Sequence, residues 1–349
     1  MRTLRERRIC NSPLLSDKSV LISGACGSLG SHLVRNILRS EAKRIVAFDI
    51  NQSKLDEMER KMRDDRLRFF LGDVRDRLRL RRAIEGCDII YHCAALKIIP
   101  SCEYNPTEAI ATNVLGSQNM IECAIETEPE IVMGISSDKA CAPLNLYGAT
   151  KLCMEKLFSS ANYYKGKRKT IFSCVRYGNV LGSSDSVIQV WREQLSREEP
   201  LTITNPEMTR FSITLDGAVG FVLRATSKAV GGEVFVPKLR AYAVRDLANV
   251  FMQLHNRSIG VVERGERPGE KRHEVLINEH ETRLAFDDGI DYVILPDPDV
   301  RERFGLVYDL ANMKPLDSSG HPYSSLYADR MSVEELRQLL TMEQVSQTE

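Results

Sequence analysis

Tyr147 and Lys151 stand four residues apart, where a helix is expected to begin. Side chains at positions i and i+4 share a helix face, so a lysine ammonium can stabilise a phenolate and lower a tyrosine pKa from about 10. A tyrosine tuned in this way can take a proton from an alcohol while hydride leaves the alcohol carbon. The spacing is frequent by chance, and in isolation a solvated helix face is the better interpretation.

A second group makes the pair less ordinary. Ser137, Asp138 and Lys139 follow the apolar run 131–136, which is expected to be a strand. They would place a hydroxyl, an acid and a base at the C-terminal end of that strand, where open α/β sheets bind ligands. The alternative for Asp138 and Lys139 is a surface ion pair. Together the two groups predict acid–base catalysis.

A glycine-rich segment, 24–30, has the pattern G-x-x-G-x-x-G between an expected strand and an expected helix. Glycines let the backbone approach a pyrophosphate closely, and the helix N-terminus offers unpaired N–H groups. The alternative is a structural turn. The residues expected to contact a dinucleotide here are Gly24, Cys26, Gly27, Ser28, Leu29 and Gly30.

Two acids strengthen the dinucleotide interpretation. Asp49 ends the second expected strand, 19 residues after Gly30, close to the spacing of an acid that binds the adenosine ribose diol. Such an acid repels a 2′-phosphate, so NAD is preferred over NADP. Asp73, followed by Val74, comes after the third strand and can bind the adenine amino group. The alternative for Asp73 is a helix N-cap.

The elements that must position these residues alternate along the first half of the chain. This alternation predicts an α/β fold with a doubly wound parallel sheet. After about Gly182 it weakens and proline and glycine recur, which predicts a smaller second lobe. Strands are expected at 19–23, 44–48, 67–71, 88–92, 131–136 and 170–175, and helices at 29–40, 53–62, 76–85, 107–126, 147–164, 244–254 and 333–342. The expected domains are an extension 1–17, a dinucleotide-binding Rossmann domain 18–181, a lobe 182–342 with segments returning to the first domain, and a tail 343–349.

Composition excludes several classes of function. The 349 residues carry 48 Lys+Arg and 48 Asp+Glu, so the net charge is zero and no nucleic-acid partner is expected. No apolar run is long enough to span a membrane, and the N-terminus lacks a signal-peptide pattern, which predicts a cytoplasmic location. The nine cysteines contain no C-x-x-C and the six histidines form no close pair, so neither a disulfide framework nor a metal site is expected.

The motifs above and several others together make the chain resemble the extended short-chain dehydrogenase/reductase family. Within it the chain resembles the inverting UDP-N-acetylglucosamine 4,6-dehydratases that begin pseudaminic acid synthesis. The resemblance covers roughly residues 17–342, and the Asp138-Lys139 pair is its specific signal. The motifs that carry it, besides those above, are His92 to Lys97, Glu103 to Pro106, Thr112 to Val114, Asn145 to Lys151, Arg176 to Val180, Met208 to Phe211 and Arg267 to Lys271.

The resemblance implies a mechanism. Tyr147, supported by Lys151, removes the proton of the sugar 4-hydroxyl while hydride passes from C4 to NAD(P)+, and Ser137 binds the 4-oxygen. Lys139 then takes the C5 proton as a neutral amine, its pKa lowered by Lys151 and the oxidised nicotinamide. A protonated Asp138 donates to the departing 6-hydroxyl. Hydride returns to C6, and reprotonation from the opposite face inverts C5, so the dinucleotide stays tightly bound and is recycled.

The resemblance also implies binding residues. The cofactor would contact Val74, Ala94, Ala95 and Asn113 in addition to the residues above. The UDP diphosphate would bind Arg210 and Arg267, and Glu270 would accept from the uridine ribose. Lys97 and Asn179 are further expected substrate contacts. A homo-oligomer, a dimer or larger, is expected.

Some positions depart from the family pattern. Residues 183–186 and Ser212 replace a glycine-containing pattern and a tryptophan beside the sugar site, and Asp49-Ile50 replaces the Ser-Arg of several NADP-accepting relatives. These departures leave the sugar and the C5 configuration open. The alternatives are a UDP-hexose 4-epimerase, against which Asp138-Lys139 argues, a retaining 4,6-dehydratase, and a non-catalytic nucleotide-binding protein.

Overall fold

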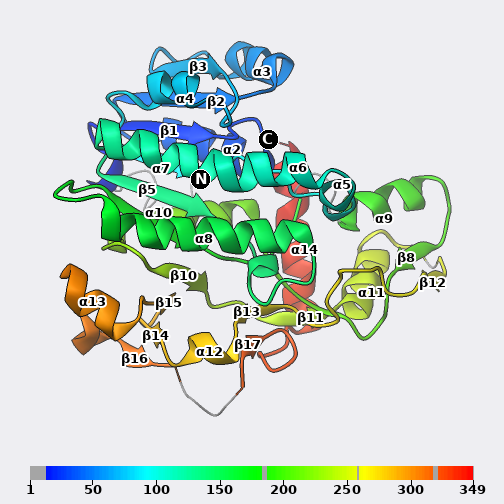
Figure 1. The fold of residues 1–349 in the computed structure, drawn as a ribbon. Coiled ribbons are helices and arrows are strands. Elements are labelled where there is room, and N and C mark those ends of the chain that lie inside the picture. The colour runs from blue at the N-terminus through cyan, green and yellow to red at the C-terminus, as the bar shows by residue number, and fades with distance from the viewer. Residues whose placement is uncertain (1–12, 183–186, 258, 317–320, 349) are drawn as a thin grey trace.

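A ten-stranded sheet forms the centre of the computed structural model, which describes residues 13–182, 187–257, 259–316 and 321–348 (Figure 1). Its order is β16-β14-β15-β10-β6-β5-β4-β1-β2-β3. The seven strands from β3 to β10 are parallel, and β15, β14 and β16 extend the sheet antiparallel. The strands are β1 Ser19–Ser23, β2 Arg44–Asp49, β3 Leu67–Leu71, β4 Ile89–His92, β5 Ile131–Ile135, β6 Ile171–Val175, β10 Val234–Pro237, β14 Ala285–Asp287, β15 Asp291–Ile294 and β16 Lys314–Pro315. The predicted α/β doubly wound fold is confirmed.

Helices cover both faces of this sheet, which explains why strands such as β1 and β5 are buried at every residue. One apolar cluster joins the sheet to α2, α3 and α10, and another joins it to α4, α7 and α8, of which α7 and α8 lie in front in Figure 1. The bounds are α2 Ser28–Leu38, α3 Gln52–Met62, α4 Arg77–Ile84, α7 Gly116–Thr127, α8 Leu146–Tyr164 and α10 Leu215–Lys228. The carboxyl ends of β1, β2, β4, β5 and β6 therefore share one edge.

The helix predicted at 107–126 differs from the structure. The range expected at 107–126 consists of α6 (Pro106–Ile110), a π-helical turn (Ala111–Leu115) and α7, with the short α5 (Ile99–Tyr104) before it. A π turn inserts a residue without breaking the apolar pattern, so the sequence reads as one helix. Gly116 follows the turn, where a Cβ would lie 2.7 Å from Val74 Cγ2. The glycine thus allows α7 to pack closely on the segment after β3.

The second half of the chain adds small sheets of order β11-β9-β7, β12-β8 and β13-β17. A third apolar cluster joins α9, α11 and α14 around the buried Trp191. The last helix was expected to end at Met342, but it continues to Thr348, and buried Glu343 forms an ion pair with Arg192 on α9. The elements are β7 Asn179–Val180, β8 Leu201–Ile203, β9 Thr209–Ile213, β11 Ala241–Ala243, β12 Val261–Glu263, β13 Val275–Ile277, β17 Tyr323–Ser324, α9 Val187–Ser196, α11 Val244–Leu254, α12 Glu279–Thr282, α13 Pro298–Phe304 and α14 Val333–Thr348.

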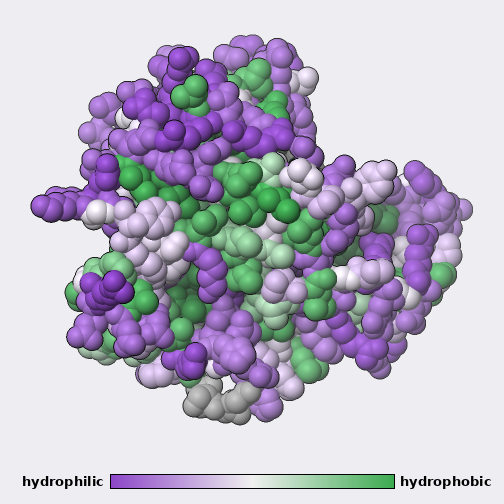
Figure 2. Space-filling model, in the orientation of Figure 1, coloured by the Kyte–Doolittle hydropathy of each residue, from purple (hydrophilic) through white to green (hydrophobic). Residues whose placement is uncertain are grey.

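The surface over α7 and α8 is partly apolar. Figure 2 shows apolar residues gathered in the middle of this face, between hydrophilic regions. Exposed apolar side chains of nearby segments include Tyr104, Ile110 and Leu115. Within the ranges that the structure describes, no helix combines the length and the apolar character needed to cross a membrane.

Candidate active site

The glycine loop joins β1 to α2 so closely that side chains are excluded. Gly24 has φ +67°, and a Cβ there would lie 2.7 Å from Ala94 N. A Cβ on Gly30 would lie 2.2 Å from the Gly24 carbonyl oxygen. The N-cap of α2 is Gly27, which has no side chain with which to cap the first-turn N–H groups. A cradle of bare backbone at a helix N-terminus fits the pyrophosphate of a dinucleotide.

Asp49 ends β2 directly against this loop. Its Oδ2 accepts a hydrogen bond from Cys26 N at 2.9 Å and its Oδ1 accepts one from Asn51 N at 2.9 Å. The carboxylate is therefore fixed between the two segments where an adenosine ribose would lie. Burial and the Asp49 charge raise the pKa of Cys26 to about 12, so its thiol stays neutral.

Asp73 is not the cap of the following helix. The N-cap of α4 is Asp76, whose side chain accepts from Arg79 N. Asp73 instead accepts from Arg75 N at 2.9 Å and forms an ion pair with the Arg75 guanidinium at 2.6 Å. Burial disfavours its carboxylate, but the bonds to Arg75 outweigh burial and lower the pKa of Asp73. The capping alternative is thus wrong for Asp73.

Asn113 lies in the π turn and holds the loop that follows β4. Its side chain is buried, accepts from Leu96 N and donates to Leu96 O, both at 2.8 Å. It also donates to Thr150 Oγ1 on α8 at 2.9 Å. Asn113 therefore fixes the loop that contains Ala94 and Ala95 against α8, because these bonds use both protons of its amide nitrogen and one acceptor position of its oxygen.

Behind this loop, His92 forms a buried hydrogen-bond chain. Its Nδ1 lies 2.8 Å from Ser23 Oγ, and its Nε2 lies 3.1 Å from Ser117 Oγ. Ser117 donates its only proton to Asn113 O, so the ring must donate from Nε2 and accept at Nδ1. Burial, followed by the charge of Lys151, lowers the pKa of His92 to about 3. His92 is a neutral structural link between β1, β4 and α7.

The expected acid and base meet directly after β5. A short 3-10 turn, Asp138–Ala140, brings Lys139 Nζ to 3.0 Å from the Asp138 carboxylate and 2.7 Å from Asn179 Oδ1. Ser137 donates to Asp138 Oδ1 at 2.9 Å. Glu274 Oε1 lies 3.4 Å from the same lysine nitrogen. Four predicted site residues are thus in contact, together with an acid that the sequence did not reveal.

The surroundings of Lys139 correct one expectation. Burial disfavours its ammonium, but the charges of Asp138 and Glu274 outweigh burial and raise the pKa of Lys139 above its usual value. The expectation of a neutral amine, with a pKa lowered by Lys151, is wrong for this structure. The resting protein holds Lys139 as an ammonium between two carboxylates.

The tyrosine–lysine pair also differs from expectation. Lys151 Nζ donates to Ile135 O at 2.7 Å, and burial lowers the pKa of Lys151 to about 8. Burial raises the pKa of Tyr147, while the Ser137 hydroxyl and the Lys139 charge act in the opposite direction. The expected lowering by Lys151 is therefore wrong here: the cation that acts on Tyr147 is Lys139.

The second half of the chain brings Arg210 beside this cluster. Arg210 Nη2 forms an ion pair with Glu270 Oε1 at 2.9 Å, and its Nε lies 3.8 Å from Glu274 Oε1. Arg267 and Lys97 lie on exposed loops. Of the expected substrate contacts, Arg210, Glu270 and Asn179 are therefore linked to the acid–base cluster by ion pairs and hydrogen bonds.

The positions that depart from the family pattern are only partly visible. Residues 183–186 lie outside the described residues. Ser212 is buried, and its Oγ lies 2.7 Å from Tyr242 Oη. Tyr242 thus packs where a larger side chain at position 212 would compete with it for space.

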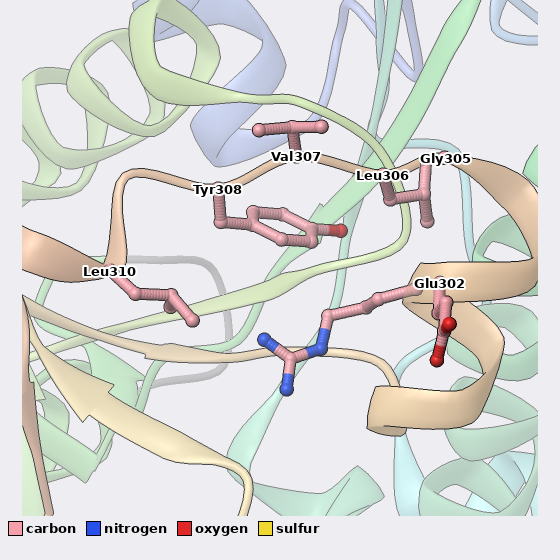
Figure 3. Close-up of a pocket in the computed structure, with 7 residues that line it drawn as sticks. Glu302, Gly305, Leu306, Val307, Tyr308 and Leu310 are labelled. Atoms are coloured by element: carbon pink, nitrogen blue, oxygen red, sulfur yellow. The ribbon is translucent and has the colours of Figure 1, made fainter.

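A separate surface pocket lies between α13 and the segment after it. Figure 3 shows Tyr308, Val307, Leu306 and Leu310 around it, with Glu302 at the end of the helix. None of its lining residues belongs to the motifs above. We assign no ligand to this pocket.

Comparison with known proteins identifies relatives along most of the chain. The family model described as polysaccharide biosynthesis protein matches residues 20–294. A Methanocaldococcus jannaschii protein described as an uncharacterized membrane protein is 46% identical over 77% of this chain and 83% of its own. The inverting UDP-N-acetylglucosamine 4,6-dehydratase of Campylobacter jejuni is 38% identical over 81% of this chain and 84% of its own.

Two further matches cover nearly the whole chain. The UDP-glucose 4-epimerase of Rickettsia rickettsii is 34% identical over 93% of this chain and 95% of its own. The crystal structure of Pen from Bacillus thuringiensis superimposes with a TM-score of 0.87 at 36% identity, covering 95% of this chain and 99% of that one. The chain therefore belongs to the polysaccharide biosynthesis protein family and has the extended short-chain dehydrogenase/reductase fold.

Proposed function

We propose that this chain removes water from UDP-N-acetylglucosamine across C5 and C6 and yields a UDP-4-keto-6-deoxy-N-acetylhexosamine with C5 inverted. The observation that carries the proposal is the Asp138–Lys139 pair beside Tyr147 at the carboxyl edge of the sheet. Dehydration needs one group that removes the C5 proton and another that protonates the leaving hydroxyl. The similarity to the Campylobacter jejuni dehydratase supports this assignment.

The first half of the chain fits a nicotinamide dinucleotide, which supplies a reversible hydride acceptor when bound. The bare loop at Gly24 and Gly30 would receive its pyrophosphate, and Asp49 its adenosine ribose. An acid at this position favours NAD over NADP. Because the proposed cycle leaves the dinucleotide unchanged, we expect the purified protein to retain it, and chromatography of the denatured protein should release NAD. Release of NADP alone would contradict the role of Asp49.

The acid–base cluster can serve the oxidation at C4 and the elimination of water. Tyr147, next to Ser137, would take the proton of the sugar 4-hydroxyl, and Lys139 would take the C5 proton. The resting pair holds one proton, on Lys139. Its transfer across 3.0 Å to Asp138 produces the neutral amine and the carboxylic acid that the elimination needs, with no proton from solvent. The resting ion pair and the amine–acid pair that the elimination needs therefore carry the same number of protons, and they differ only in which of the two residues holds one of them.

The nucleotide part of the substrate would lie toward the second half of the chain. Arg210 and Arg267 would bind the diphosphate, because guanidinium donates paired hydrogen bonds to phosphate oxygens. Glu270 would accept from the uridine ribose. Asn179, which accepts from Lys139 at 2.7 Å, lies close enough to the base to orient the sugar as well.

One incubation tests the proposal. The purified protein is mixed with UDP-N-acetylglucosamine in deuterated water and the product is identified by NMR. A 4-keto-6-deoxy sugar with inverted C5 carrying deuterium is expected. A retained C5 configuration would contradict the inverting reaction, and no turnover of any UDP-hexose would refute the proposed activity.

A pair of variants tests the base. Lys139→Ala is expected to abolish elimination, whereas Lys156→Ala, an exposed lysine on α8, should keep wild-type activity. Cofactor reduction by the substrate should survive in Lys139→Ala but be slower, because Tyr147 and Ser137 remain while the Lys139 charge that favours the phenolate is lost. If Lys139→Ala dehydrates at the wild-type rate, Lys139 is not the base.

A UDP-hexose 4-epimerase is the second candidate, favoured by the similarity to the Rickettsia rickettsii protein. Epimerisation at C4 uses the tyrosine and the dinucleotide but no base at C5. A 4-hydroxy epimer without deuterium at C5 in the same incubation would identify this activity.

A further inference from the structure

Glu274 is a buried acid that contacts two cations of the site and belongs to none of the sequence motifs. It precedes β13, and its side chain is 3% exposed. Oε1 lies 3.4 Å from Lys139 Nζ and 3.8 Å from Arg210 Nε. Oε2 is buried and has no hydrogen-bond partner within the described ranges.

A comparison with Glu233 shows why this arrangement is unusual. Glu233 is equally buried, but its Oε1 accepts from Val230 N at 2.5 Å and its Oε2 accepts from Gly231 N at 2.6 Å and Ser173 Oγ at 3.0 Å. Glu233 therefore has a complete structural role in its loop. An unsatisfied buried polar group costs about 1–3 kcal/mol. Glu274 Oε2 is such a group, and a buried, unsatisfied titratable group beside other charges is typical of functional sites.

Three different elements fix the Lys139 nitrogen. Asp138 holds it from its own turn at 3.0 Å, Asn179 from β7 at 2.7 Å and Glu274 from the segment before β13 at 3.4 Å. Of these three residues, Glu274 is the one that reaches it from the last third of the chain. The titratable and charged groups that act on or are influenced by Lys139 are Asp138, Tyr147, Arg210, Tyr242, Lys271 and Glu274.

We propose that Glu274 is the positioning residue that fixes the Lys139 amine and makes it a stronger proton acceptor. The inference rests on the proposed function, in which Lys139 takes the C5 proton. In that step the C5–H bond breaks, its electron pair forms the enolate of the 4-ketone, and the proton forms a new N–H bond on Lys139. A carboxylate at 3.4 Å stabilises the resulting ammonium.

Competitive reductive methylation tests this role without a nucleotide sugar. Formaldehyde and a mild reductant modify only neutral amines, and peptide mass spectrometry compares Lys139 with the exposed Lys156 in the same sample across a pH series. Glu274→Gln is expected to speed the labelling of Lys139 relative to Lys156 by at least about tenfold, because a nearby opposite charge shifts a pKa by about 1–3 units. Glu274→Asp keeps the charge and should stay within about threefold of wild type.

The matched control is Glu233→Gln, which removes a buried carboxylate away from the site and should leave Lys139 labelling unchanged. The proposal is overturned if Glu274→Gln leaves the relative labelling unchanged, or if Glu274→Asp speeds it as much as Glu274→Gln. If Glu274→Gln does not fold, the wild-type series decides: a titration midpoint of Lys139 at or below that of Lys156 overturns the proposal, and a higher midpoint supports it.

The outcome is separable from that of the proposed function. If labelling behaves as expected and no UDP-hexose is converted, the charge role of Glu274 stands and the dehydratase assignment falls. Where turnover is found, Glu274→Gln should also move the pH profile of deuterium incorporation at C5 to lower pH, which a purely structural role would not do.

Discussion

Replacing Arg176 with methionine is expected to lower the free energy of unfolding by about 3–5 kcal/mol, because two carboxylates lose their buried counter-charge. Arg176 is 1% exposed. Its guanidinium binds Glu155 at 2.6 and 2.9 Å, Glu281 twice at 2.8 Å, and Leu276 O at 2.8 Å. Glu155 lies on α8 and Glu281 on α12, so this cation ties the dinucleotide-binding half to the C-terminal half.

The expected loss converts into a measurable change in melting temperature. At roughly 2.1 cal/mol/K per residue, the unfolding entropy of a chain of this length is about 0.7 kcal/mol/K. A loss of about 3–5 kcal/mol then lowers Tm by about 4–7 °C. Calorimetry gives the Tm, and urea unfolding gives the free energy. Arg81→Met is the control, since its ion pair with Glu126 is 46% and 36% exposed and should contribute less than about 1 kcal/mol.

The sign of the pH dependence follows from Glu281. Burial disfavours its carboxylate, but Arg176 outweighs burial and lowers the pKa of Glu281. The stabilisation that the Glu281 carboxylate gives to the folded protein is therefore fully present above the pKa of this group in the unfolded chain, about 4.3, and is lost as pH falls through its pKa in the folded protein. Without Arg176, only the hydrogen bonds from Asn278 N and Cys141 still oppose burial, so the pKa of Glu281 is higher in the variant, and the variant should approach wild type in acid. A deficit below about 1 kcal/mol, or one equal at about pH 3.5 and about pH 7.5, would refute this reasoning.

Two further changes test the loop and the helix. In Gly30→Ala the new Cβ would lie 2.2 Å from the Gly24 carbonyl oxygen, so the loop must open. We expect the purified variant to retain at least about tenfold less dinucleotide, measured by absorbance. Retention at the wild-type level would show that this loop does not bind the dinucleotide. Lys151→Met removes an ammonium whose pKa is lowered by burial to about 8. The free energy of unfolding of the wild type should therefore rise by up to about 3 kcal/mol relative to this variant as pH increases from about 8 to about 10.5. A difference in unfolding free energy that does not change with pH would contradict the lowered pKa of Lys151.

Local patterns were enough to predict six of the seven parallel strands, and β10 was missed. Strands buried on both faces read as short apolar runs, and the strand–glycine–helix order at 19–40 has few structural solutions. The same local order placed Asp138 and Tyr147 at the carboxyl edge. The strands of the second half escaped prediction because several contain only two or three residues, such as β7 and β16.

What the sequence could not reveal depends on contacts between distant segments. Glu274 lies 136 positions after Asp138, and nothing in its neighbourhood marks it as a partner of Lys139. The pKa of a buried lysine depends on which charges fold against it, and the shift of the Lys139 pKa was predicted in the wrong direction because only Lys151 and the oxidised nicotinamide were considered and the two carboxylates were not. Spacing shows which residues share an element, but burial and partners decide their protonation.

The acid–base cluster also constrains how an anionic substrate binds. Asp138, Lys139, Glu274, Arg210 and Glu270 form an alternating chain of three acids and two cations, which is net negative when all are ionised. Because the whole chain is neutral, no global field draws a diphosphate to this place. A diphosphate that binds Arg210 must therefore replace Glu270 at 2.9 Å as its partner. The displaced carboxylate is then able to accept a hydrogen bond from a ribose hydroxyl. The roles proposed for Arg210 and Glu270 therefore depend on each other, because breaking their ion pair frees both side chains for the substrate.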